Sequence, residues 1–206
     1  MSTRSFYISW KSRKFSETQC YAVLFILLIP ASYFIIQLEN GNRILFHGIV
    51  FSTGFIMFTF FEYIAHRFWM HGKEEKHPGK RLELHRHHHT HPTELKITAC
   101  MRNCLLLANL ILVAVAFWLD NYFTLFTGFY SGFVSYCFMH VILHKRWAGK
   151  LFPALQVSHI HHHCKYPDRC FGICTTRWDQ LFNTTVPKEI KISERILQFY
   201  FGNHDH

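Results

Sequence analysis

Charged residues are absent from four long stretches of the chain. No Asp, Glu, Lys or Arg occurs in the 21 residues between Glu17 and Glu39, and the same holds for three later stretches of 17 to 24 residues. A helix rises about 1.5 Å per residue, so 18 to 20 apolar residues cross a hydrocarbon layer of roughly 30 Å. The pattern predicts an all-α fold with four transmembrane helices, at about residues 20–39, 44–65, 103–119 and 121–144.

Polar, histidine-rich segments follow the second and fourth of these helices, at residues 66–102 and 145–206. They predict a helical cap, and the cap and the spans together fit a single membrane domain over residues 1–206. Half of the residues are hydrophobic and 22 are Phe. A small soluble domain with four fully apolar core helices is the alternative that this composition leaves open. Pro30 predicts a kink in the first helix.

The distribution of positive charge predicts the orientation of the protein. Of 22 Lys and Arg residues, only Arg43 falls on the face opposite the cap if the chain crosses the membrane four times. Positive residues collect on the cytoplasmic side, so we expect the cap to face the cytosol. The membrane would be the endoplasmic reticulum in a eukaryote or the inner membrane in a bacterium. The net charge is +9. Attraction to anionic lipid head groups explains part of this basic excess, so the charge does not require a nucleic acid partner.

Two further expectations follow from the predicted placement. The first apolar stretch begins after about twenty mostly polar and charged residues, so we expect no cleavable signal peptide. The seven Cys residues lie on or near the cytosolic face and are expected to be reduced thiols rather than a disulfide framework.

Ten histidines form four groups near the cap ends of the predicted helices. They are His66 and His71; His85, His88 and His89; His140 and His144; and His159, His162 and His163. Both triplets have the pattern H-x-x-H-H, and positions i, i+3 and i+4 share one face of a helix, so each triplet can direct three imidazoles to one place. His66 and His71 are five residues apart and would point about 140° from each other on an α-helix. Either the helical turn loosens there or the two approach a site from different sides.

The number of histidines favours two metal ions. All four groups follow an even number of membrane crossings, so all ten imidazoles are expected on one face. Imidazole suits Fe, Zn, Cu and Ni, and a structural zinc site is complete with four ligands. Ten ligands therefore fit two ions with about five each and open positions, although the spacing does not assign each histidine to an ion.

Several nearby residues are given other roles. Glu62 and Asp179 could each accept a hydrogen bond from a ligand histidine and fix its tautomer, or could form plain salt bridges. His87 and His161 lie about 160° from the face shared by their triplets and are predicted to be solvent-exposed or supporting residues. His91 is also predicted not to be a ligand. His47, almost 30 Å from His66 by helical rise, is expected to be a packed core residue.

The order of these motifs resembles the integral-membrane fatty acid hydroxylase and sterol desaturase superfamily. The pattern H-x4-H, H-x2-HH, H-x3-H, H-x2-HH runs from His66 to His163, and the segment FGICTTRWDQLFNT follows the last motif. Within the superfamily the chain is most similar to fatty acid 2-hydroxylases. Cys137, Lys145 and Asn183 depart from the pattern, standing where relatives often have an acid, a further histidine and a glycine. The cytochrome domain fused to some relatives is also absent from the sequence.

The resemblance implies a cytosol-facing dimetal centre, with two Fe ions that zinc can replace in purified protein. It implies O2-dependent hydroxylation of a lipid acyl chain at C2, with electrons from a small haem cytochrome or a ferredoxin and its reductase. No catalytic residue beyond the metal centre is predicted. Two alternatives remain: oxidation of a carotenoid or sterol by the same centre, and a zinc-handling membrane protein without oxygenase activity.

Overall fold

The structure is a computed structural model that describes residues 15–16, 18–23, 26, 43–71, 80–95, 97–119, 122–187 and 190–202. These residues form helices joined by loops and contain no strand, as the sequence predicts. The elements are α2 (Arg43–Ile64), the π-helix η1 (Ala65–Met70), α3 (Lys80–Thr90), α4 (Ala99–Leu119), α5 (Phe123–Leu143), α6 (Ala148–Leu151), α7 (Pro153–Cys164), α8 (Arg177–Leu181) and α9 (Glu194–Phe201).

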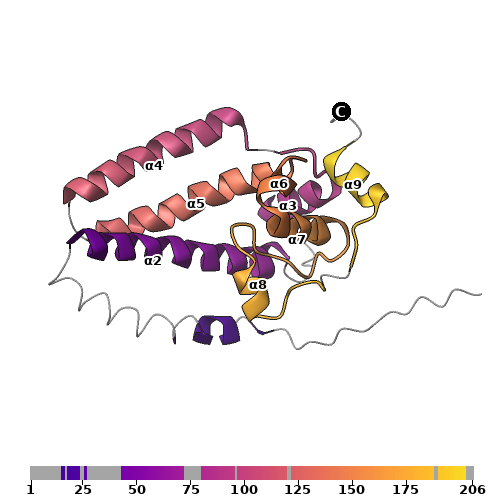
Figure 1. The fold of residues 1–206 in the computed structure, drawn as a ribbon, viewed down its shortest axis with the longest axis horizontal. Helices are drawn as coiled ribbons and strands as arrows, with labels where there is room; N and C mark the ends of the chain where they lie inside the picture. The colour runs from indigo at the N-terminus through magenta and orange to yellow at the C-terminus, as the bar shows by residue number, and fades with distance from the viewer. Residues whose placement is uncertain are drawn as a thin grey trace, which may run out of the picture.

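Within the described residues, three helices are long and apolar enough to cross a membrane. They are Arg43–Met70, Ala99–Leu119 and Phe123–Leu143, which correspond to the second, third and fourth predicted spans. Most of the predicted first span at residues 20–39, including the kink at Pro30, lies outside the described residues. The shorter helices α3 and α6 to α9 gather at one end of the three long helices, and this gathering is the cap (Figure 1).

The outer helix α4 presents hydrocarbon to its surroundings. Ala116 is its one buried residue, whereas Leu107, Phe117 and Trp118 are 60%, 88% and 80% exposed. An apolar surface of this extent is unusual on a protein in water and suits contact with lipid. Figure 1 shows α5 between α4 and α2, and α5 contacts both. Helix α5 is therefore the centre of the described part of the bundle.

Small residues allow α2 and α5 to pack closely. Gly54 of α2 lies against the Leu125 carbonyl of α5, and Gly128 of α5 lies against the Phe51 carbonyl of α2. Gly128 and Gly132 form a G-x-x-x-G pattern, and Gly132 receives the ring of Phe58. In membranes, where the hydrophobic effect does not drive helices together, such small residues permit the backbone contact that holds a helix pair.

Replacing Gly128 with alanine should destabilise this pair. The new Cβ would overlap the Phe51 carbonyl, which is backbone and cannot turn away, so the helices must separate. We expect a loss of about 1–3 kcal/mol in the free energy of unfolding, the usual cost of overpacking. Thermal unfolding in detergent measures the loss. Gly48→Ala is the matched control, since its Cβ would meet no atom within 4 Å. Equal stability of the two variants would contradict this packing.

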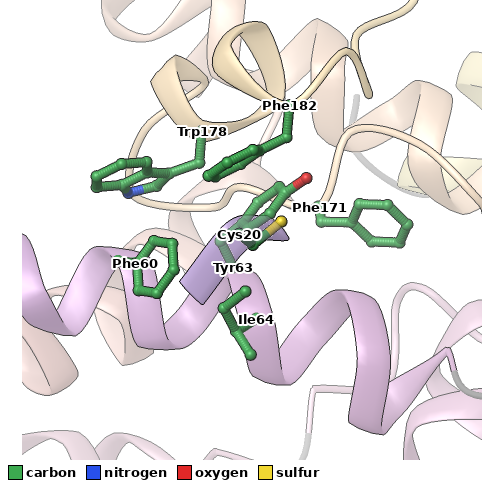
Figure 2. Packing of buried hydrophobic residues seen from close by; sticks show 7 residues of the cluster. All are labelled: Cys20, Phe60, Tyr63, Ile64, Phe171, Trp178 and Phe182. Atoms are coloured by element: carbon green, nitrogen blue, oxygen red, sulfur yellow. The ribbon is translucent and has the colours of Figure 1, made fainter. Parts of the chain in front are cut away.

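A cluster of aromatic residues fastens the chain after α7 to the cap end of α2. Trp178 of α8 packs edge-on against Phe60 at 5.1 Å between ring centroids, and Phe182 stacks on Tyr63 at 5.4 Å. Figure 2 shows these rings reaching from α8 toward α2, with Cys20, Ile64 and Phe171 completing the cluster. The Trp178 indole also donates a hydrogen bond to Thr59 Oγ1 at 3.0 Å. Residues 169–184 are thereby held beside the histidine-bearing end of α2.

Candidate metal centre

The ten histidines that the sequence singles out lie together in the cap, in two groups of five. In each group the nearest ring nitrogens all lie within 4.8 Å of one another. The first histidine group is His66, His71, His85, His89 and His162, and the second is His88, His140, His144, His159 and His163. Four elements or their ends supply them: η1, α3, α5 and α7.

A loosened helical turn brings His66 and His71 together. Residues Ala65–Met70 form a π-helix, and His71 is its C-terminal cap. Hydrogen bonds from i to i+5 place residues five apart over one another, unlike those of an α-helix. The two rings are 5.2 Å apart between centroids, and both contact His85. Of the two arrangements that the sequence leaves open, the loosened turn is the one observed.

The two H-x-x-H-H triplets are divided between the groups, which corrects the expectation that each serves one place. His85 and His89 of α3 join the first group, while His88 joins the second. On α7 the reverse holds, because His159 and His163 join the second group and His162 joins the first. Side chains at i and i+4 lie almost above one another, whereas i+3 is turned 100° from i+4. Each helix therefore reaches both groups.

Hydrogen bonding alone cannot account for the crowding of ring nitrogens. His85 Nε2 lies 2.8 Å from His71 Nε2, 3.1 Å from His89 Nε2 and 3.2 Å from His66 Nε2. A single Nε2 either donates one hydrogen or offers one lone pair, so it cannot satisfy three such neighbours. Nitrogens bound to one ion at about 2.1 Å are themselves roughly 3 Å apart, which is the spacing seen here.

The second histidine group has the same spacing and adjoins the first. His88 Nε2 lies 2.9 Å from His140 Nε2, and His159 Nε2 lies 3.2 Å from His144 Nε2. The rings of His89 and His163, one from each group, stack at 4.3 Å between centroids with an interplanar angle of 13°. The two groups therefore lie in direct contact with each other.

Burial keeps these imidazoles neutral. Desolvation lowers the pKa of His71 and of His88 to about 4, and that of His89 to about 3. Desolvation, followed by repulsion from neighbouring histidines, holds the pKa of His162 and of His163 well below its usual range. Neutral imidazole is the form that binds a metal ion, so the rings need not lose a proton first.

The stability of the metal-free protein should consequently fall in mild acid. In the unfolded chain these histidines bind protons near pH 6.5, whereas in the folded protein His71 and His88 do so near pH 4. The unfolded state therefore binds more protons between these values, and stability is lost as the pH falls from 6.5 to 4. Thermal unfolding of chelator-treated protein across this range measures the effect. A midpoint independent of pH would contradict it.

Backbone carbonyls orient two ligands of the first histidine group. His66 Nδ1 donates to the Phe171 carbonyl at 2.6 Å, and His162 Nδ1 donates to the Arg169 carbonyl at 2.7 Å. With Nδ1 protonated, Nε2 carries the lone pair that faces the group. The sequence did not predict either partner, because every residue has a backbone carbonyl and the residue type does not show which one is used.

Glu62 and Asp179 contact backbone N–H groups rather than the ligand histidines that the sequence suggested. Glu62 accepts hydrogen bonds from the backbone N–H groups of Ile173 and Cys174 at 2.6 and 3.2 Å. Asp179 accepts from those of Phe171 and Gly172 at 2.8 and 2.9 Å. Among the described hydrogen bonds, neither carboxylate receives one from a histidine. Both instead fix the loop that presents the Phe171 carbonyl.

Tight turns in this segment explain two residue choices. A Cβ at position 172 would overlap the Thr175 carbonyl and lie 2.9 Å from an Asp179 oxygen, so Gly172 fits where a side chain would not. Asn183, which stands where relatives often have glycine, has φ +56°. Asn tolerates this left-handed conformation better than most residues, so Asn183 can form the same turn as a glycine.

Burial raises the pKa of Asp179 to about 6, although its hydrogen bonds lower it.

The other histidines among the described residues lie outside both groups. His87 stacks on His91 at 4.5 Å, and its Nε2 lies 3.9 Å from Glu94. His161 is 4% exposed, so it is a buried residue rather than a solvent-exposed one. His47, near the opposite end of α2, is half-buried rather than part of the core, and its Nδ1 is within hydrogen-bonding distance of Thr124 Oγ1 at 3.3 Å.

Tyr200 is a part of the site that sequence reasoning missed. It is fully buried, its ring stacks on His144 at 4.7 Å, and its hydroxyl donates to the Leu143 carbonyl at 3.2 Å. Helix α9 thus covers the second histidine group. The residue pattern of α9 predicts only an amphipathic helix and does not indicate that this helix reaches the histidines.

Comparisons with known proteins identify the family of this chain. The family model described as fatty acid hydroxylase matches residues 51–184. Dihydroceramide fatty acyl 2-hydroxylase FAH1 of Arabidopsis thaliana is 32% identical over 140 residues, 64% of this chain and 58% of that protein. Fatty acid 2-hydroxylase of Mus musculus is 27% identical over 68% of this chain and 40% of its own length. The chain spans about half the length of these curated relatives.

A solved structure, full-length scs7p with only its hydroxylase domain visible, aligns with a TM-score of 0.48 at 22% identity. The alignment covers 88% of this chain and 70% of that one. The family match itself covers well over half of the chain and contains all ten clustered histidines. The chain belongs to the fatty acid hydroxylase family.

Proposed function

We propose that this protein is a membrane-bound dimetal monooxygenase that hydroxylates a lipid acyl chain at the carbon beside its carbonyl. The observation that carries the proposal is the pair of adjoining five-histidine groups at one end of the apolar helices. Relatives with this family match are named as hydroxylases of fatty acids, dihydroceramide fatty acyl chains and ceramides. The substrate class proposed here is accordingly an acyl lipid of the sphingolipid type.

The residues fit two metal ions. Nε2 of His162 and Nε2 of His163 are buried and have no hydrogen-bond partner among the described residues. Each belongs to a different group, so each group has at least one ring nitrogen whose burial requires a partner. The proposed ligands are the five histidines of each group, and the proposed ions are iron, which zinc can replace in purified protein. Bound iron would supply the O2-dependent oxidation of a C–H bond, which side chains cannot perform.

The chain's own residues orient the ligand histidines and enclose the proposed metal site. The Phe171 and Arg169 carbonyls hold His66 and His162 in one tautomer, and Glu62 and Asp179 hold the loop that carries the first of these carbonyls. Tyr200 and α9 exclude water from the second group. In the overall reaction one oxygen atom enters the C–H bond and the other leaves as water. The electrons and protons that this needs come from an external donor, proposed to be a small haem cytochrome or a ferredoxin with its reductase.

Placement at a membrane boundary suits an amphiphilic substrate. His66 lies at the cap end of the apolar segment Arg43–Met70, and His140 at the cap end of α5. We place the cap on the cytosolic side because Lys and Arg collect there. A lipid could then keep its head group near water while its acyl chain remains in hydrocarbon.

Expression in a host that lacks 2-hydroxylated lipids tests the proposal. Lipid mass spectrometry should detect new 2-hydroxy acyl species, and purified protein should consume O2 when supplied with NADH and a redox chain. Altered carotenoids or sterols without 2-hydroxy acyl lipids would instead indicate that the same centre oxidises a carotenoid or sterol. Tightly bound zinc without O2 consumption, even after reconstitution with iron, would favour a zinc-handling protein.

A further inference from the structure

An apolar groove of about 480 Å³ runs between α4 and α5 on the cap side of the bundle. One wall is formed by Met101, Cys104, Leu105 and Ala108 of α4. These positions are i, i+3, i+4 and i+7, so they lie on one face of the helix. The groove therefore follows from the residue pattern of α4 and not from an accident of one side chain.

The facing wall comes from α5 and is equally regular. It consists of Tyr130, Phe133, Tyr136 and Cys137. Including Ile97 at the cap end, no residue that lines the groove carries a charge. Both helices are apolar enough to cross a membrane, so the groove lies within the hydrocarbon layer and is suited to a hydrocarbon occupant.

The cap end of the groove meets the second histidine group. The ring of Tyr136 stacks on His140 at 5.9 Å between centroids, with an interplanar angle of 19°. Nε2 of His140 in turn lies 2.9 Å from Nε2 of His88. An occupant of the groove therefore has one end beside the candidate metal centre.

A hydrogen bond joins the two helices near the other end of the groove. Ser131 Oγ donates a hydrogen bond to Asn109 Oδ1 at 2.8 Å. Asn109 follows Ala108 on the side away from the cap, and Ser131 is the neighbour of Tyr130 on the cap side. From His140 to Tyr130 is ten residues of α5, or about 15 Å by helical rise. This is about half of the ~30 Å hydrocarbon layer, the depth of one leaflet.

We infer that this groove binds the acyl chain of the substrate lipid, with the carbonyl end at His140 and the tail toward Ala108. The inference rests on the proposed function and deepens it by naming the residues that hold the tail. It also supplies a reason for oxidation at C2: the carbon beside the carbonyl stays at the histidine end, while later methylene groups lie along the groove. Ala108, the lining residue of α4 farthest from the cap, would then limit the length of chain that is accommodated.

Ala108→Phe tests the inference by filling the lower part of the groove. In the expression host, the ratio of long-chain to short-chain 2-hydroxylated products should fall about tenfold, as expected from lost burial of about two methylene groups. Ala114→Phe is the matched control, since it makes the same change on the exposed side of α4. An unchanged ratio in Ala108→Phe, or an equal change in Ala114→Phe, would overturn the inference.

Two cysteines provide a measurement that does not depend on activity or on metal. Cys104 and Cys100 are both exposed and one helical turn apart, but only Cys104 lines the groove. In detergent, an added N-palmitoyl lipid at about ten times its Kd should slow maleimide labelling of Cys104 roughly tenfold and leave Cys100 unchanged. Equal protection of both thiols, or protection by any phospholipid, would show non-selective lipid contact and overturn the inference.

The two experiments separate this inference from the proposed function. Failure of the proposed function would appear as absence of 2-hydroxy acyl lipids with the wild-type protein. Failure of the groove would appear as wild-type product with an unaltered chain-length ratio in Ala108→Phe and an unprotected Cys104.

Discussion

Replacing His162 with alanine should lower hydroxylated lipid by more than about 100-fold and weaken metal binding at the first histidine group. The His162 ring packs within 4.7 Å, between centroids, of three other members of that group, His66, His71 and His89. Its Nε2 is buried without a partner among the described residues. Removing His162 leaves four imidazoles in the first histidine group.

Metal analysis after dialysis against a chelator should show this effect directly. About half of the metal held by the wild-type protein should become removable, because the second histidine group keeps all five of its members. His161→Ala is the matched control, since His161 is the preceding residue, is also buried and belongs to neither group. Normal product and metal retention in His162→Ala would refute the ligand role. The same loss in His161→Ala would indicate a general effect on α7.

Asp179→Asn should destabilise the cap and loosen the first histidine group without removing a ligand. Asp179 Oδ1 accepts from Phe171 N–H and from Thr184 Oγ1 at 2.7 Å, and Oδ2 accepts from Gly172 N–H at 2.9 Å. An amide has one acceptor oxygen, so its NH2 group must face a donor. Loss of a buried hydrogen bond to a charged group costs about 1.5–3 kcal/mol in the free energy of unfolding.

Asp179→Asn should also weaken metal binding, because the loop that it shifts carries the Phe171 carbonyl. That carbonyl accepts the hydrogen bond of His66 Nδ1, so a shifted loop leaves His66 less well oriented. We expect metal affinity to fall 10- to 100-fold, the usual range for loss of such outer contacts. Competition with a chelator measures the affinity, and thermal unfolding measures the stability. Glu94→Gln, at an exposed carboxylate, is the control.

A stable Asp179→Asn variant with wild-type metal affinity would show that the loop does not depend on this carboxylate. A destabilised variant with unchanged affinity would instead show that Asp179 supports the fold alone. Only the joint loss supports the chain of contacts from Asp179 through Phe171 to His66.

Local patterns in the sequence determined much of the architecture. Uncharged stretches marked α2, α4 and α5 to within a few residues, because a helix that faces lipid must be apolar all round. The spacing of the histidines indicated which ones gather at one end, because an even number of crossings returns the chain to the same side. The five-residue step from His66 to His71 also required either an altered turn or separate approaches, and the π-helix is the altered turn.

The tertiary structure alone decided how the ten histidines are shared. Helical spacing shows which side chains leave a helix in similar directions, but not which of two neighbouring groups each one meets. That depends on how α3 and α7 face each other, and here each triplet is divided between the groups. Glu62 and Asp179 were recognised as important carboxylates, yet their partners are backbone N–H groups of a distant loop. Every residue carries such N–H and carbonyl groups, so residue types cannot reveal which of them the fold brings to the site.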